Sequence, residues 1–125
     1  MKEITKEWVR LATADMMSAK HLLTLYPLSL EVICYLCSQC SEKMLKAFLV
    51  ENEQAPPRIH DLTHLNKLCV EINEKFEFLN DQCTNLMPYG VHVRYPNNLE
   101  LIEDDMRLAI IDAENIFNFV SNILK

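Results

Sequence analysis

Glycine is nearly absent from this sequence of 125 residues, since Gly90 is the only one. No stretch alternates cleanly between apolar and polar residues either. A β-rich fold depends on both turn glycines and such alternation, so these two absences disfavour it. The sequence also lacks an apolar run close to the ~20 residues that a membrane-spanning helix requires. We therefore expect no association with a membrane.

The net charge of −6 at pH 7 excludes a generally basic surface. A protein with this balance repels nucleic acid and anionic membranes over most of its surface. A nucleotide or RNA ligand would therefore have to bind at a local cluster of basic side chains.

The cysteines form neither an obvious disulfide framework nor an obvious metal site. There are five, an odd number, and Cys34, Cys37 and Cys40 lie within seven residues. This usage is typical of a reducing compartment, and we expect a cytoplasmic protein with five reduced thiols. The three close cysteines form two overlapping CxxC spacings, but residues three apart on a helix drift by about 60° per step and do not converge. Zinc requires four ligands, and no second Cys or His pair has suitable spacing. We therefore predict buried thiols, with no metal and no cofactor.

Apolar residues recur at helical spacing in most of the chain. Helices are expected over residues 5–25, 29–51, 62–73, 77–86 and from 98 to near the C-terminus. Thr5, Asp61 and Asn98 are the expected caps of the first, third and last helices. Helices of these lengths with short connections predict an all-α fold, an up-and-down antiparallel bundle of about five helices. We expect one domain, spanning residues 1–125.

The expected polar face of the second helix carries two of the few cations in the sequence. Glu42, Lys43 and Lys46 lie on this face together with Gln39, and we expect it to be solvated. These lysines matter for function only if Arg58, His60 and Arg94, which lie in irregular segments, fold back over them. Such focusing of positive charge would allow an acidic domain to hold a nucleotide.

Two irregular segments carry the other candidate residues. His60 precedes the expected cap Asp61, where its imidazole can donate to a phosphate or carry a proton near neutral pH. The alternative is a helix cap followed by an ordinary histidine. Arg94 and Tyr95 precede Pro96, and a guanidinium held in this way can bind a phosphate with two hydrogen bonds. The alternative is an arginine that ties its loop to a carboxylate.

Four segments, in this order, resemble the HEPN family (higher eukaryotes and prokaryotes nucleotide-binding), particularly its small prokaryotic members. The stretch from Trp8 to Ala19 is similar to the first helix of that family. Residues 37–47 resemble its QxxEKxxKA signature, residues 60–62 its HDL motif and residues 94–96 its RYP motif. The resemblance covers nearly the whole chain.

The resemblance implies a five-helix bundle that commonly forms a homodimer. Such proteins are often encoded beside a minimal nucleotidyltransferase and are thought to supply its substrate-binding or partner function, in several cases as a toxin–antitoxin pair. Carried over residue by residue, the resemblance places a nucleotide- or partner-binding site at Lys43, His60, Arg94 and Tyr95. Gln39, Glu42 and Lys46 would have supporting or structural roles.

The sequence departs from the ribonuclease branch of the family, which carries an arginine followed about five positions later by a histidine. None of the four arginines, Arg10, Arg58, Arg94 and Arg107, is followed by histidine at that spacing. We therefore favour a binding module that lacks catalytic activity on its own. The alternative is a metal-independent endoribonuclease in which His60 and Arg94 converge in space. A purely structural dimerisation unit is the third hypothesis.

Overall fold

The computed structural model describes residues 1–90 and 100–125, and helices account for most of them. The α-helices are α1 (Glu3–Leu22), α2 (Leu30–Glu51), α3 (Leu62–Ile72), α4 (Asn80–Leu86) and α5 (Glu103–Leu124). Two 3₁₀ helices, η1 (Glu74–Leu79) and η2 (Met87–Gly90), flank α4. The described residues contain no strand, which confirms the predicted all-α bundle.

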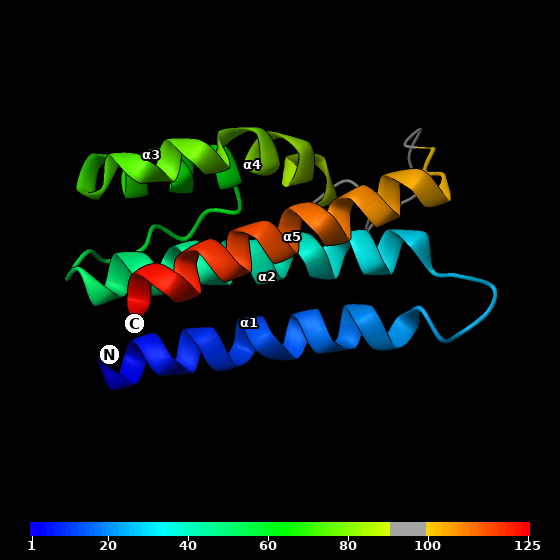
Figure 1. The fold of residues 1–125 in the computed structure, drawn as a ribbon, viewed down its shortest axis with the longest axis horizontal. Helices are drawn as coiled ribbons and strands as arrows, with labels where there is room; N and C mark the ends of the chain where they lie inside the picture. Colours follow the sequence, from blue (N-terminus) through cyan, green and yellow to red (C-terminus); the bar gives the residue numbers. More distant parts are fainter. Residues whose placement is uncertain (91–99) are drawn as a thin grey trace.

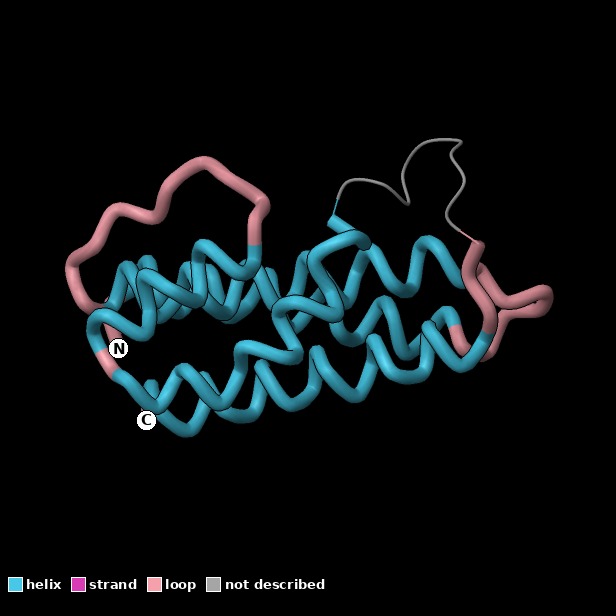
Figure 2. Tube along the Cα trace, turned by 90° about the horizontal axis from the view of Figure 1, so that it is seen from above, coloured by secondary structure: helices cyan, strands magenta, loops and turns pink. Residues whose placement is uncertain are grey.

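Helix α2 contacts all four of the other α-helices (Figure 1). Helix α1 runs antiparallel to α2, whereas α5 runs in the same direction as α2 (Figure 1). The long connection after α2 runs back along the bundle before α3 begins (Figure 2), which allows α5 to share the direction of α2. This connection, residues 52–61, carries His60 back to the middle of α2, where it contacts Glu42.

In the core, a line of three aromatic rings connects α2, η1 and α5. Phe76 of η1 is fully buried, and its ring centroid lies 4.3 Å from that of Phe48 on α2 and 5.1 Å from that of Phe119 on α5. Offset and edge-to-face contacts of this kind add to the free energy of burying apolar surface. This cluster holds together the ends of α2 and α5 and the start of η1.

The helix termini agree with the sequence at α3 and differ at α1 and α5. The Asp61 carboxylate accepts a hydrogen bond from the His64 N–H at 3.1 Å, which confirms the predicted cap. The predicted cap at Thr5 is wrong, because its hydroxyl lies inside α1 and donates to Glu51 at 2.8 Å. The last helix begins at Glu103, later than predicted, where the Asp105 carboxylate accepts from the Ile102 N–H at 3.1 Å.

Three further predictions concern the cap at Asn98, the polar face of α2 and membrane-spanning helices. The predicted cap Asn98 lies outside the described residues. The solvated face predicted for α2 is wrong at two positions, because Glu42 and Lys46 are only 4% and 7% exposed. None of the described helices is long and apolar enough to span a membrane.

Candidate functional site

A buried ion pair on α2 supports an exposed histidine. Glu42 and Lys46 lie four residues apart, so their side chains share one face of the helix. The Lys46 Nζ donates to Glu42 Oε2 at 3.1 Å, and the other carboxylate oxygen, Oε1, lies 2.9 Å from His60 Nδ1. One carboxylate therefore joins a lysine of its own helix to a histidine from the 52–61 connection. We call these three residues the Glu42 triad.

The triad is desolvated on one side and open on the other. The Glu42 and Lys46 side chains are only 5% and 8% exposed, whereas the His60 side chain is 61% exposed. The Lys46 Nζ also lies 5.7 Å from the centroid of the Trp8 ring, a cation–π distance that covers the ammonium from the α1 side. A charge buried to this extent requires a partner, and Glu42 supplies it.

Glu42 also fixes how His60 presents its ring. An ionised carboxylate can only accept hydrogen bonds, so beside an ionised Glu42 the shared proton belongs to His60 Nδ1, and Nε2 is the ring nitrogen that does not contact Glu42. The next residue, Asp61, is anchored separately by Thr63 Oγ1 at 2.6 Å, and this hydrogen bond holds the pKa of Asp61 below its usual value. The cap therefore holds the backbone beside His60 while Glu42 holds its imidazole.

Lys43, the lysine of the predicted site, has a different partner from Lys46. The Lys43 Nζ lies 2.5 Å from Asp15 Oδ2 on α1, and both side chains are about one-fifth exposed, at 22% and 18%. The described contacts connect Lys43 to α1 and connect Lys46 to the carboxylate that holds His60. The sequence therefore singled out His60, but its direct partner Glu42 was assigned only a supporting role.

The chain leaves the described region directly beside His60. A Cβ added at Gly90 would lie 3.2 Å from Ser38 Oγ and 3.6 Å from the His60 carbonyl oxygen. The absence of a side chain thus allows the end of η2 to approach α2 and the 52–61 connection closely. Ser38 Oγ is buried and has no hydrogen-bond partner within residues 1–90 and 100–125. The predicted site residues Arg94 and Tyr95 lie outside the described residues.

The cysteines lie in the core, away from this surface. All five are buried and unpaired, at positions 34, 37, 40, 69 and 83. Burial raises the pKa of Cys34, Cys40 and Cys83 from 9.0 to about 12, and it raises the pKa of the other two further. Protonated thiols are poor nucleophiles and poor metal ligands. In the described part of the chain, no group of three His, Cys, Asp or Glu side chains is placed to hold a metal ion.

Sequence reasoning missed the triad because it placed Glu42 and Lys46 on a solvated face. The available signal was the EKxxK spacing, which sets Glu42 four residues before Lys46 and favours an ion pair within the helix. No spacing rule relates Glu42 to His60, which lies 18 residues further along the chain. That contact arises from the path of the 52–61 connection.

Comparison with known proteins gives the same fold over nearly the full chain. An archaeal HEPN homologue, ST0689, is 24% identical, with a TM-score of 0.78 and 100% of both chains covered. The protein TT1696 from Thermus thermophilus is 18% identical, with a TM-score of 0.81 and coverage of 97% of this chain and 98% of that one. No curated protein matches the sequence. The model of the HEPN domain matches residues 5–123. The chain therefore belongs to the HEPN domain family.

Proposed function

We propose that this HEPN domain binds the phosphate groups of a nucleotide or of single-stranded RNA through the exposed edge of His60. Family membership supports a helical module that works with nucleotides or RNA. The observation that carries the proposal is the hydrogen bond between His60 Nδ1 and Glu42, 2.9 Å long, beneath an imidazole that remains 61% exposed. A ring fixed in this way loses little conformational entropy when Nε2 meets a ligand.

The local charge favours an anion more than the net charge suggests. Lys46 balances Glu42 within the triad, so protonation of His60 gives the triad a net positive charge. Arg58, two residues before His60, is exposed and forms no ion pair with any described residue. Arg58 therefore adds a positive charge that is close to His60 along the chain, and a guanidinium is a favourable group for binding phosphate.

The remaining members of the proposed site come from the family motifs. Arg94 is proposed to bind the phosphate with two hydrogen bonds and Tyr95 to stack on the ligand or brace the loop. Support comes from Gly90, which precedes this motif by four residues and lies against the backbone of His60. Lys43 is also part of the proposed site, and a phosphate bound there would compete with Asp15 for the Lys43 ammonium.

We further propose that the chain acts with a minimal nucleotidyltransferase, as the substrate-binding or partner component of a two-protein system of the toxin–antitoxin class. Support comes from the family membership and from the lack of the Arg-x4-His motif of the ribonuclease branch. A nucleotidyltransferase encoded next to this chain should co-purify with it when both are expressed. Complete separation of the two proteins on a sizing column would contradict this part of the proposal.

Binding to a labelled RNA tests the phosphate site. Fluorescence anisotropy with a fluorescein-labelled single-stranded RNA should show that His60→Ala weakens binding about tenfold, the value of one charge-assisted hydrogen bond. His21→Ala is the matched control, because His21 is also exposed but lies at the far end of α1. Equal affinities for both variants and the unmodified protein would overturn the proposal.

A specific observation also favours a second function, metal-independent endoribonuclease activity. A carboxylate bound to one nitrogen of an exposed histidine is a common arrangement for general acid–base catalysis. In this alternative His60 Nε2 would transfer a proton during attack on the scissile phosphate. RNA cleavage in the presence of EDTA, lost in His60→Ala, would support catalysis, whereas binding without cleavage would leave the chain a binding module.

A further inference from the structure

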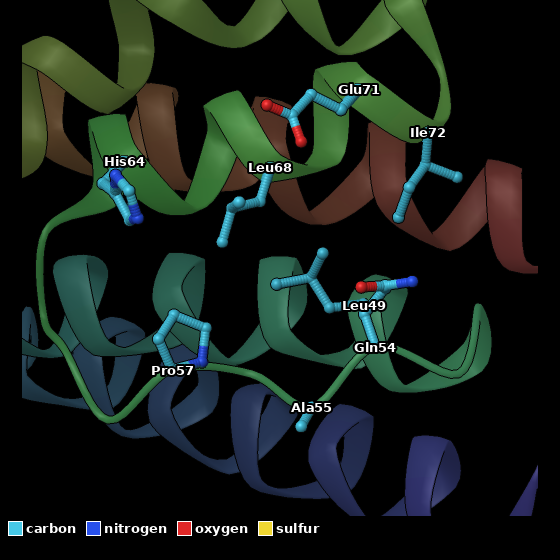
Figure 3. Close-up of a pocket in the computed structure, with 8 residues that line it drawn as sticks. All are labelled: Leu49, Gln54, Ala55, Pro57, His64, Leu68, Glu71 and Ile72. Carbon is cyan, nitrogen blue, oxygen red and sulfur yellow. The ribbon is translucent and has the colours of Figure 1, made fainter.

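A recess lies beside the 52–61 connection, on the side of α3 (Figure 3). Its volume is about 470 Å³, within the range of cavities that hold small ligands. It is bounded by the end of α2, the first half of the connection and one face of α3. Neither the family motifs nor the Glu42 triad includes any residue of this recess.

The recess has an aliphatic floor. Leu68 on α3 and Leu49 on α2 point toward one another, and Ile72 closes one end (Figure 3). On the side of the connection, the ring of Pro57 forms part of the wall. Apolar side chains of this kind suit a ring system better than a flexible polar chain, because they cover its apolar face without leaving polar groups unpaired.

Three hydrogen-bonding side chains surround this floor. His64 and Glu71 lie on the same face of α3 on either side of Leu68, at spacings of four and three residues, and Gln54 approaches from the connection (Figure 3). The Glu71 carboxylate makes no ion pair with a described residue, although Lys67 and Lys75 lie four positions away on either side. The recess thus combines an unpaired carboxylate, an amide and an imidazole.

An ionised carboxylate discriminates among the nucleobases because it can only accept hydrogen bonds. Guanine offers two adjacent donors, N1–H and the N2 amino group, and both can bind one carboxylate. Adenine and cytosine place an acceptor nitrogen beside their amino group, and that nitrogen would face the carboxylate unfavourably. Uracil has one N–H between two carbonyl oxygens. Of the four bases, guanine is therefore the complementary one.

We propose that this recess binds the guanine base of the nucleotide or RNA whose phosphate is held at His60. Glu71 would accept from N1–H and N2–H, His64 and Pro57 would contact the ring, and Gln54 would donate to O6. The inference rests on the proposed phosphate site. The two sites are close along the connection, because Pro57 and His60 are three residues apart and an extended chain covers at most about 3.6 Å per residue.

Four labelled RNA pentamers that differ in the central base test the proposal: UUGUU, UUAUU, UUCUU and UUUUU. Fluorescence anisotropy should show about tenfold tighter binding of UUGUU, as expected for one bidentate base contact at an open site. Glu71→Gln should abolish this preference, because its amide NH₂ would face the two guanine donors. Glu77→Gln is the matched control, since it removes the same charge from an exposed residue of η1 outside the recess.

Each result decides between the base recess and the phosphate site. A preference for UUGUU that is lost in Glu71→Gln but kept in Glu77→Gln supports the recess. Equal binding of all four RNAs, weakened for all by His60→Ala, overturns the base recess and leaves the phosphate site intact. A guanine preference that survives Glu71→Gln also overturns it. Absence of binding to every RNA overturns both proposals.

Discussion

Removal of the Glu42 carboxylate should destabilise the fold more than removal of either of its partners. The variant Glu42→Leu keeps a side chain of similar size but leaves the Lys46 ammonium, 8% exposed, without its carboxylate. Breaking a buried ion pair on one side typically costs about 3–5 kcal/mol. The Trp8 ring, 5.7 Å from Lys46 Nζ, offsets only part of this, so a loss of about 3 kcal/mol is expected.

The other substitutions in the triad rank below this one. Lys46→Met should cost about 1–2 kcal/mol, because Glu42 keeps His60 as a partner that can be protonated. His60→Ala should cost less than about 1 kcal/mol, because its side chain is 61% exposed. The double variant Glu42→Leu/Lys46→Met should recover to within about 1 kcal/mol of the unmodified protein, since no buried charge remains unpaired.

Urea denaturation followed by circular dichroism measures these free energies of unfolding, provided that the dependence on urea concentration stays constant among the variants. Glu77→Gln is the control for the loss of an exposed carboxylate. A double variant that is less stable than Glu42→Leu alone would contradict a stabilising role of the buried ion pair. A Glu42→Leu variant that is as stable as the control would contradict it equally.

Three other predictions concern the core and the assembly. Ser38→Ala should raise the unfolding free energy by about 1 kcal/mol in the same denaturation assay, because it removes a buried hydroxyl with no described partner. The pKa of buried Cys34, Cys40 and Cys83 is raised from 9.0 to about 12, so the unfolded chain ionises first and stability should fall as the pH rises above about 9; urea titrations at pH 8 and 10 that give equal stability would contradict this. Light scattering should give twice 14.6 kDa, because exposed apolar side chains such as Ile111, at 55%, are expected to lie in a homodimer interface; a monomeric mass would refute the dimer.

The helices were largely predictable because apolar spacing reports which face of each helix is buried. The cap at Asp61 was predictable as well, because capping is a local interaction between a side chain and the next turn. Burial of Lys46 was not, since a lysine is buried only where the fold provides a carboxylate and an apolar cover, here Glu42 and Trp8. The start of α5 was placed too early because Asp105, three residues after Ile102, supplies the capping carboxylate.

For the candidate site, the sequence suggested His60 from its position but gave no indication of its contact with Glu42. His60 drew attention as the residue before a helix cap, but its partner lies on another helix. Lys43 and Lys46 were both placed on the solvated face of the second helix, yet one side chain contacts Asp15 and the other contacts Glu42. Motifs in the sequence could not predict the recess beside α3, because it forms where the 52–61 connection passes α2 and α3.

The most direct test of the central claim is the NMR signal of the His60 ring nitrogens during titration with single-stranded RNA. Long-range proton–nitrogen correlations distinguish Nδ1 from Nε2 in each of the four histidines. Our account predicts that Nδ1 of His60 carries the proton shared with Glu42 in the free protein, and that RNA changes the Nε2 signal of His60 but leaves His21 unchanged. An Nε2–H tautomer in the free protein, or RNA-dependent shifts that spare His60, would contradict the account.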